Sequence, residues 1–278
     1  MSLSAHIRAN VKAALEEDIG SGDLTAQLIA AGTHASATVI TREDAILCGT
    51  LWFEECFRTL DADCRIDWKL REGERATADQ VLCEIHGDAR AMLSAERPAL
   101  NFLQTLSAVA SVTRRYVDAA QGHKAKIMDT RKTLPGLRHA QKYAVTVGGG
   151  HNQRVGLFDG VLIKENHIAA AGGIDKVMEL AFRVTPPQTP IQIEVEDMTE
   201  LDEALQAGAR LILLDNFSLE DIKRAVEHSA GRAELEASGG ITLENIPRIA
   251  ATGVDRISIG ALTKDVKAID LSMRVRLP

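Results

Sequence analysis

The sequence predicts an α/β protein: an N-terminal α+β sandwich domain followed by an incomplete, open α/β barrel of about six β/α units. Two observations lead to this fold class. Strand and helix patterns mix irregularly over the first part of the chain, whereas short apolar runs recur regularly after Gly122. The last four of these runs end at Glu194, Asp215, Ser238 and Gly260, so they are 21, 23 and 22 residues apart. That spacing is typical of parallel strands joined by crossover helices.

The length and composition are consistent with this organisation. A chain of 278 residues accommodates one barrel-sized domain and a smaller companion. Its 45% hydrophobic and 26% charged residues are ordinary for a globular protein. No apolar run approaches the ~18 residues of a membrane span, and the first residues do not resemble a signal peptide. We therefore expect no membrane as a partner, and four cysteines without a Cys-x-x-Cys pair indicate reduced thiols in a cytoplasmic protein.

The first domain is expected to contain both helices and strands. Helices are predicted at residues 5–17 and 51–60 and strands at 37–47, 64–70 and 81–85. Pro98 is expected to open a long helix at 99–120, since proline fits the first turn of a helix. Residues 269–275 alternate like a strand that returns to the first domain's sheet. The predicted domains are therefore residues 1–112, joined by 267–278, and a catalytic barrel at 113–266.

The barrel prediction rests on six apolar runs. They occupy residues 126–129, 161–164, 191–194, 211–215, 233–238 and 256–260. Helix-starting patterns follow several of them, for example at Ser218 and Thr242. Because a closed barrel has eight units, we expect an open barrel whose free side is covered by another element.

The charge distribution indicates a small anionic ligand. A net charge of −7 argues against nucleic acid as a partner. Residues 131–164 nevertheless carry +5, which leaves −12 for the rest of the chain. The cations of this segment, opposed by the single acid Asp159, are Arg131, Lys132, Arg138, Lys142, Arg154 and Lys164.

Glycine turns end the last two predicted barrel strands, at Ser238-Gly239-Gly240 and at Ile259-Gly260-Ala261. Backbone N–H groups in such turns bind phosphate, and glycine lets the anion approach closely. The alternative is that these are ordinary turn glycines. Two such turns on adjacent terminal strands favour phosphate, because this is where barrels of this kind bind it.

Two carboxylates, Glu194 and Asp215, end neighbouring strands. They are suited to binding ribose hydroxyls, to holding Mg²⁺ through water, or to stabilising a developing positive charge. The alternative is an ion pair with Lys132 or Lys164. Glu196, two residues beyond Glu194, ranks second as a candidate.

Lys164 has two possible roles, as a Schiff-base lysine or as a fixed cation for an anionic ligand. The arginines nearby favour the second role. Arg131 and Arg154 are the candidates for holding a dicarboxylate, because guanidinium binds a carboxylate in a bidentate manner. Residues 148–150 are glycines, and we expect them to form a flexible loop that closes over the ligand.

Together with these strand-end residues, further segments give the sequence a resemblance to the quinolinate phosphoribosyltransferase family that extends over nearly the whole chain. The most specific matching segment is Thr130-Arg-Lys-Thr-Leu-Pro-Gly-Leu-Arg138. The other matching segments lie at residues 17–25, 96–103, 142–145, 148–150, 162–167, 214–217, 236–240 and 258–263.

The resemblance implies a reaction, a fold and an assembly. The reaction transfers phosphoribose from phosphoribosyl pyrophosphate to quinolinate with decarboxylation, as a step of NAD biosynthesis. The fold is an α/β sandwich over an open barrel. The assembly is a homodimer in which Arg97 reaches the partner's quinolinate.

The resemblance also implies roles for individual residues. Quinolinate is bound by Thr130, Arg131, Arg154 and Lys164. Lys132, Glu194 and Asp215 form the catalytic and pyrophosphate-binding group, with Mg²⁺ at the two carboxylates. The phosphate is held by Ser238, Gly239, Gly240, Ile259, Gly260 and Ala261.

One residue departs from the family pattern. Gln153 precedes Arg154 where family members often have histidine, and we assign no proton transfer to it because an amide carries no titratable proton. Three alternative functions stay open: a related transferase for another acid, a Schiff-base aldolase using Lys164, and a non-catalytic sensor of phosphorylated ligands.

Overall fold

The structure is a computed structural model that describes residues 2–277, and it divides into two compact units. The first unit contains the chain up to Arg114, Thr133–Gly149 and the residues from Thr263 onward. The second contains Arg115–Lys132 and Gly150–Leu262. The boundary expected after residue 112 lies within one long helix, and a division into domains there stays a prediction.

The first unit is built on an antiparallel sheet in the order β12-β1-β5-β3. Its elements are α1 (Leu3–Ile19), η1 (Ala26–Leu28), β1 (His34–Thr41), β2 (Ala45–Ile46), α2 (Thr50–Leu60), β3 (Arg65–Trp68), β4 (Arg75–Ala76), β5 (Val81–Asp88), α4 (Arg138–Val147) and β12 (Leu271–Arg276). Buried and less buried residues alternate along β1, which is the pattern of a sheet with one face on a core. Trp52, Phe53 and Phe57 of α2 belong to that core, since each is at most 1% exposed.

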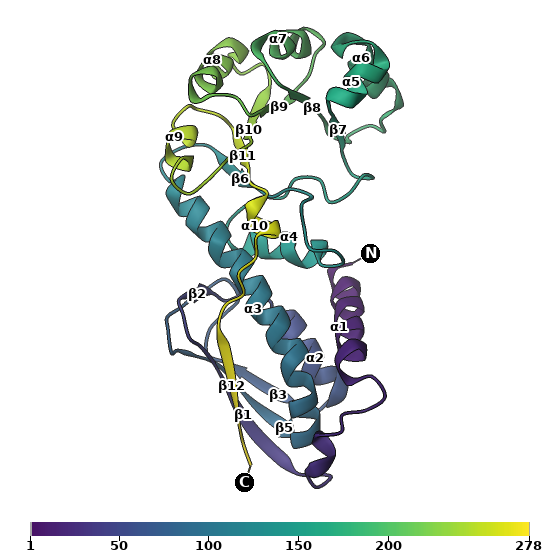
Figure 1. The fold of residues 1–278 in the computed structure, drawn as a ribbon, viewed down its shortest axis with the longest axis vertical. Coiled ribbons are helices and arrows are strands. Elements are labelled where there is room, and N and C mark those ends of the chain that lie inside the picture. The colour runs from purple at the N-terminus through teal and green to yellow at the C-terminus, as the bar shows by residue number, and fades with distance from the viewer. Residues whose placement is uncertain (1, 278) are drawn as a thin grey trace. The chain divides into compact units, whose positions relative to one another are not determined.

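The C-terminal strand joins the N-terminal sheet. β12 pairs antiparallel with β1, with Thr38 opposite Arg274, and Figure 1 shows the two strands side by side. The alternation at residues 269–275 therefore predicted the position of this segment correctly.

The long helix begins earlier than predicted. α3 spans Ala89–Ala119, so Pro98 lies inside it and does not open it. The residue that caps the helix is Asp88, whose Oδ1 accepts a hydrogen bond from the N–H of Ala91 at 3.0 Å. No glycine interrupts residues 89–97, and an interior proline removes one helical hydrogen bond without ending a well-packed helix.

The second unit contains a six-stranded parallel sheet in the order β6-β11-β10-β9-β8-β7. Its strands are β6 (Lys126–Met128), β7 (Val161–Ile163), β8 (Ile191–Val195), β9 (Leu211–Asp215), β10 (Glu234–Ser238) and β11 (Arg256–Ser258). These are the six predicted runs, with β6 and β7 at the two edges. The predicted fold class is confirmed.

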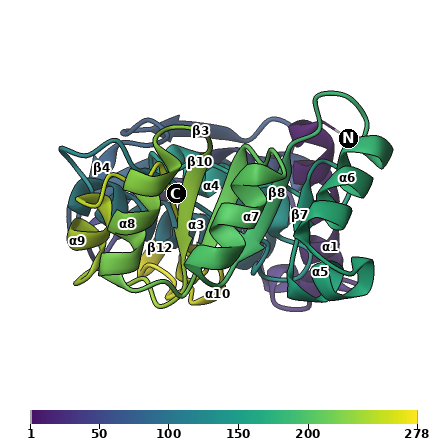
Figure 2. The same ribbon diagram turned by 90° about the horizontal axis from the view of Figure 1, so that it is seen from above.

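Helices connect these strands. Between β7 and β11 they are α5 (Glu165–Ala171), α6 (Ile174–Val184), α7 (Met198–Gln206), α8 (Leu219–Ser229) and α9 (Ile246–Ala250), whereas α10 (Ala261–Lys264) follows β11 and leads on to β12. Figure 1 shows α6, α7 and α8 along the outer side of the curved sheet, and Figure 2 shows them following one another when seen from above. Within residues 2–277, no helix is both long and apolar enough to cross a bilayer.

All four cysteines are buried, which controls their reactivity. Burial raises the pKa of Cys56 to about 12 and that of Cys64 to about 11, and it also raises the pKa of Cys48 and Cys83. In each case the nearby carboxylates raise the pKa further. Because the thiolate is the nucleophile, these thiols are expected to be inert near neutral pH.

We predict that a thiol-specific disulfide reagent at pH 8 labels none of the four cysteines within minutes in the folded protein, and all four in guanidinium. The unfolded thiols ionise near pH 8.5, before the folded ones. The free energy of unfolding should therefore be unaffected below pH 8 and fall above it, by about 1.4 kcal/mol per pH unit for each thiol. Urea titrations between pH 7 and pH 10 measure this slope. Rapid labelling of the folded chain would contradict the assignment of these cysteines to the core.

Candidate active site

The carboxyl ends of the six parallel strands bring most of the predicted site residues together in the second unit. Lys164 follows β7, Glu194 lies near the end of β8, and Asp215 ends β9. Ser238 ends β10, Gly260 follows β11 closely, and residues 130–132 follow β6. All six ends lie at one edge of the sheet because the strands are parallel. This edge is where α/β barrels carry their chemistry.

The register of the sheet shows which side chains share a face. Glu194 lies opposite Leu213, and Leu213 lies opposite Glu236, so these three side chains point to the same side. The intervening residues, among them Ile193 and Ile212, are at most 1% exposed and form the opposite, buried face of the sheet. The polar side chains therefore line the inner face of the curved sheet.

Glu194 and Lys164 form an ion pair. The Nζ of Lys164 lies 2.9 Å from Oε1 and 2.8 Å from Oε2 of Glu194, whose side chain is only 11% exposed. Of the two ion-pair partners considered for Glu194, the structure thus shows Lys164. The lysine side chain is 44% exposed, so it can also meet a ligand.

Asp215 lies beside the turn after β10. It pairs in register with Ser238, and the Nδ2 of Asn216 donates a hydrogen bond to its Oδ2 at 2.8 Å. Asn216 has a left-handed backbone with φ of 56°, and its N–H donates to the carbonyl of Ser238 at 2.9 Å. Asn216 was not among the predicted site residues, although it follows the strand-end carboxylate directly.

The backbone conformation at position 239 and the atoms around it both require glycine. The φ of Gly239 is +97°, and a Cβ placed there would lie 2.0 Å from the Oδ1 of Asn216. Only glycine therefore allows the turn after β10 to lie against the end of β9.

We predict that Gly239→Ala lowers the free energy of unfolding by about 2–3 kcal/mol and weakens the binding of a phosphate group at this turn. Gly240→Ala is the matched control. Gly240 also has a positive φ, of +59°, but a Cβ there meets no atom within 4 Å, so only the backbone strain remains. Urea unfolding and phosphate binding of both variants measure the difference. Equal effects of the two substitutions would show that the contact with Asn216 is unimportant.

Gly260 makes room for Lys132. A Cβ at Gly260 would lie 3.1 Å from the Cδ of Lys132 and 3.7 Å from the Oγ1 of Thr130. The same Oγ1 accepts a hydrogen bond from the N–H of Lys132 at 3.0 Å. The end of β11 and the segment after β6 are thereby in contact, as expected for a site that combines a glycine turn with a lysine.

The two arginines Arg131 and Arg154 are close enough to influence each other. Burial and the positive charge of Arg131 lower the pKa of Arg154, while Asp159 opposes this effect. One Nη1 donor of Arg154 is bound to the carbonyl of Gly160 at 2.9 Å. Because two guanidinium groups repel each other when partly buried, a bound anion would stabilise this arrangement.

A small cavity of about 170 Å³ lies against the turn after β10. Ser238 and Gly239 line it, together with Asn245 and Arg248. Asn245 holds the turn in place, since its Nδ2 donates to the carbonyl of Gly240 at 2.9 Å. Sequence reasoning missed Asn245 and Arg248 because they belong to α9 and its approach, not to a strand end.

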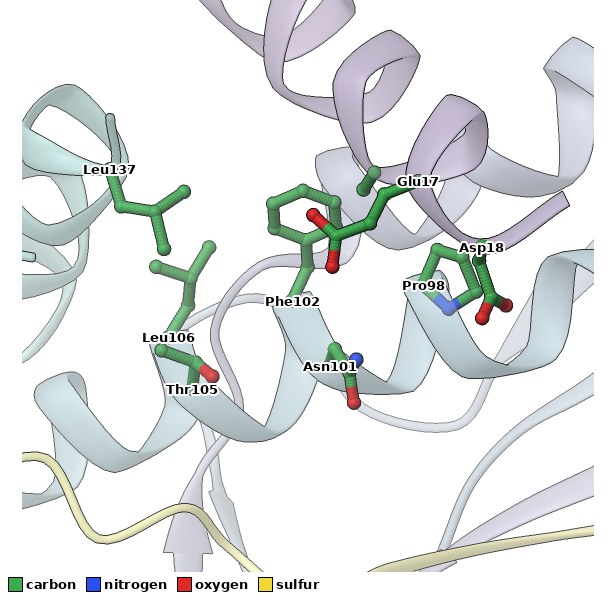
Figure 3. A pocket seen from close by; sticks show the side chains of 9 residues that line it. Glu17, Asp18, Pro98, Asn101, Phe102, Thr105, Leu106 and Leu137 are labelled. Atoms are coloured by element: carbon green, nitrogen blue, oxygen red, sulfur yellow. The ribbon is translucent and has the colours of Figure 1, made fainter. Parts of the chain in front are cut away.

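The predicted residue Arg97 lies in the first unit, on α3. Its side chain is 60% exposed, and its Nη2 lies 4.0 Å from Glu96. Glu17 and Asp18, from the first of the family-like segments, line a cavity of about 160 Å³ in the same unit, and Figure 3 shows them beside Pro98, Asn101 and Phe102. This cavity has no cation in its lining, so its two carboxylates do not suit an anionic substrate.

The expectation of a flexible glycine loop is wrong for Gly148. This residue caps α4 with an ordinary helical φ of −67°, and a Cβ there would lie 2.6 Å from the carbonyl oxygen of Ala110. Gly148 thus allows α4 to pack closely on α3. Gly149 of this segment has a positive φ, of +91°.

Comparisons with known proteins agree with this geometry. The model of the quinolinate phosphoribosyl transferase N-terminal domain matches residues 23–107, and that of the C-terminal domain matches residues 109–274. The chain belongs to the quinolinate phosphoribosyltransferase family.

Individual family members match over nearly their whole length. The nicotinate-nucleotide pyrophosphorylase [carboxylating] of Mycobacterium leprae is 42% identical over 96% of this chain and 96% of its own length. The probable enzyme of the same name from Bacillus subtilis is 41% identical over 94% of this chain and 90% of its own. The solved structure of nicotinate-nucleotide pyrophosphorylase from Francisella tularensis is 45% identical, with a TM-score of 0.95, over 99% of this chain and 98% of that one.

Proposed function

We propose that this chain transfers the 5-phosphoribosyl group from phosphoribosyl pyrophosphate to quinolinate, giving nicotinate mononucleotide, pyrophosphate and CO₂ in NAD biosynthesis. As a member of the quinolinate phosphoribosyltransferase family, it is a pentosyltransferase. The observation that carries the assignment to this site is the gathering of cations, carboxylates and glycine turns at one edge of the parallel sheet. Anionic groups of both substrates can be bound there at once.

The proposed roles follow from the geometry. The turns at Ser238–Gly240 and Ile259–Ala261 hold the 5′-phosphate, and Lys132, which lies over Gly260, meets the pyrophosphate. The arginines Arg131 and Arg154, with Thr130 and Lys164, hold the two carboxylates of quinolinate. Bidentate guanidinium contacts orient the ring so that its nitrogen faces the ribose C1 carbon.

The reaction then needs no covalent enzyme intermediate. The pyridine nitrogen forms a bond to C1 as the bond from C1 to the pyrophosphate oxygen breaks, and Glu194 and Asp215 stabilise the oxocarbenium-like charge. The C2 carboxylate leaves as CO₂, and its electron pair stays on C2 beside the cationic nitrogen. A solvent proton completes the product.

The same two carboxylates fit Mg²⁺. Their oxygens are the hard ligands that this ion prefers, and Mg²⁺ commonly binds through one or two carboxylates plus substrate phosphates. Both oxygens of Glu194 contact Lys164, which favours binding through water at that residue. When bound, Mg²⁺ would neutralise charge on the pyrophosphate.

The test is pyrophosphate release by the purified protein with phosphoribosyl pyrophosphate and Mg²⁺, with quinolinate or nicotinate as the acid. We expect release with quinolinate only, together with an equal amount of CO₂. Release with nicotinate only would assign the chain to another acid. Binding of phosphoribosyl pyrophosphate without release would indicate a sensor.

We further propose a cytoplasmic homodimer in which Arg97 contributes to the partner's quinolinate site. The support is the exposure of Arg97, whose ion pair with Glu96 has a distance of 4.0 Å, the limit for such a pair. Arg97→Ala and Arg131→Ala homodimers should each be nearly inactive. If Arg97 acts across the dimer, mixed dimers carry one intact site, and remixing should restore roughly a quarter of wild-type activity. No recovery in proven mixed dimers would place Arg97 in its own subunit's site.

A further inference from the structure

Three side chains from separate segments, two of them buried and one partly buried, form a polar cluster in the second unit. The Nε2 of Gln153 donates hydrogen bonds to Oε1 of Glu236 and, at 3.3 Å, to Oε1 of Gln192. The Nε2 of Gln192 donates to Oε2 of Glu236 at 3.1 Å, which closes the ring. Gln192 is 6% exposed and Glu236 is 0% exposed. We call these three residues the amide–carboxylate cluster.

Each member of the cluster is joined through the backbone to a candidate site residue. Gln192 lies two residues before Glu194 on β8, and Glu236 lies two residues before Ser238 on β10. Residues two apart on a strand share a face, so these side chains lie one step deeper on the inner face. Gln153 directly precedes Arg154. The cluster therefore forms a layer beneath the site.

The backbone of Gln153 is also held. Its N–H donates to Oδ1 of Asp129 at 2.8 Å, and Asp129 is 0% exposed. Two residues earlier, His151 forms a parallel bridge with Met128 at the end of β6. The segment before Arg154 is thus fixed to β6 by its backbone and to β8 and β10 by the side chain of Gln153.

The carboxyl group of Glu236 is removed from water, which is unfavourable for its charged form. Burial raises the pKa of Glu236, and hydrogen bonds from Gln192 and Gln153 act in the opposite direction. A buried carboxyl group that loses a hydrogen-bond donor costs about 1–3 kcal/mol, so the ring resists rearrangement. The side-chain amide of Gln153 therefore binds a carboxylate of this chain, that of Glu236.

We propose that Gln153 and Glu236 are positioning residues for quinolinate: Glu236 anchors the side chain of Gln153, and this fixes the guanidinium of Arg154 for its substrate. The inference rests on the proposed function. A histidine at position 153 could serve in the same way, because a histidine ring N–H can donate a hydrogen bond to the same carboxylate.

The first experiment compares Gln153→Leu and Gln153→His in steady-state kinetics with both substrates. Leucine fills similar space without a donor, whereas histidine restores one. We expect Gln153→Leu to raise the KM for quinolinate at least about tenfold while that for phosphoribosyl pyrophosphate changes less than about threefold. Histidine should bring the KM for quinolinate back to within about threefold of wild type. An unchanged KM for quinolinate, or a failure of histidine to restore it, would overturn the proposal.

Glu236→Gln is the independent test if Gln153→Leu fails to fold. This substitution preserves the shape of the side chain, but it replaces one carboxylate oxygen of Glu236 by an amide nitrogen. The side-chain nitrogen of either Gln153 or Gln192 therefore loses its acceptor. We again expect a larger KM increase for quinolinate than for phosphoribosyl pyrophosphate, and equal or reversed effects would overturn the proposal. Wild-type protein in the same assay separates the two hypotheses. Its inactivity with quinolinate refutes the proposed function, whereas active wild type with unaffected variants refutes only the positioning role.

Discussion

Replacing Arg131 by alanine is expected to lower kcat/KM for quinolinate about a hundredfold or more, because a charge-assisted bidentate contact to a carboxylate is lost. The KM for phosphoribosyl pyrophosphate should change far less, since we propose that the glycine turns and Lys132 hold that substrate. Initial rates with each substrate varied in turn measure both constants. Burial and the charge of Arg131 lower the pKa of the neighbouring Arg154, so both guanidinium groups contribute positive charge to the same candidate anion site.

Two further variants serve as controls for Arg131. Arg131→Lys keeps the charge but not the planar pair of donors, so it should recover only part of the lost affinity. Arg183→Ala removes an exposed arginine on α6 and should leave both KM values unchanged. If Arg131→Ala weakens both substrates equally, Arg131 is not a specific quinolinate ligand.

The strand ends of the barrel were predictable because they depend on local patterns. Short apolar runs at intervals of about 22 residues fix where each parallel strand ends, and the polar residue at that end must then face the site. Glu194, Asp215 and Ser238 were found in this way. The specific pairing of Glu194 was not decidable from the sequence, since Lys132 and Lys164 both lie at strand ends.

Features that depend on long-range contacts were missed or mistaken. Gln153 is 83 residues from Glu236, and nothing local distinguishes Glu236 from other strand residues. Gly148 was interpreted as part of a flexible loop, although its role is close packing against Ala110. Pro98 was predicted to open the helix because proline fits a first turn, whereas the structure caps the helix at Asp88.

Lys164→Ala is expected to lower kcat about a thousandfold, because it removes a cation from the substrate site and leaves Glu194 without its partner. The Glu194 side chain is only 11% exposed, so water compensates poorly for the lost ammonium group. Lys164→Arg retains the charge and should keep kcat within about thirtyfold of wild type. Lys176→Ala, an exposed lysine on α6, is the control and should behave as wild type.

The same variants separate a fixed cation from a Schiff-base nucleophile. A Schiff-base lysine forms its bond through a neutral amine, so arginine could not replace it, and both variants would be equally inactive. Borohydride with a carbonyl compound would then add mass at Lys164 in the wild-type protein. Both oxygens of Glu194 contact the Nζ of Lys164, at 2.9 and 2.8 Å, so a carbonyl compound would have to displace this contact to reach the nitrogen. We therefore expect no trapped adduct and a measurable kcat for Lys164→Arg, which together would exclude the aldolase interpretation.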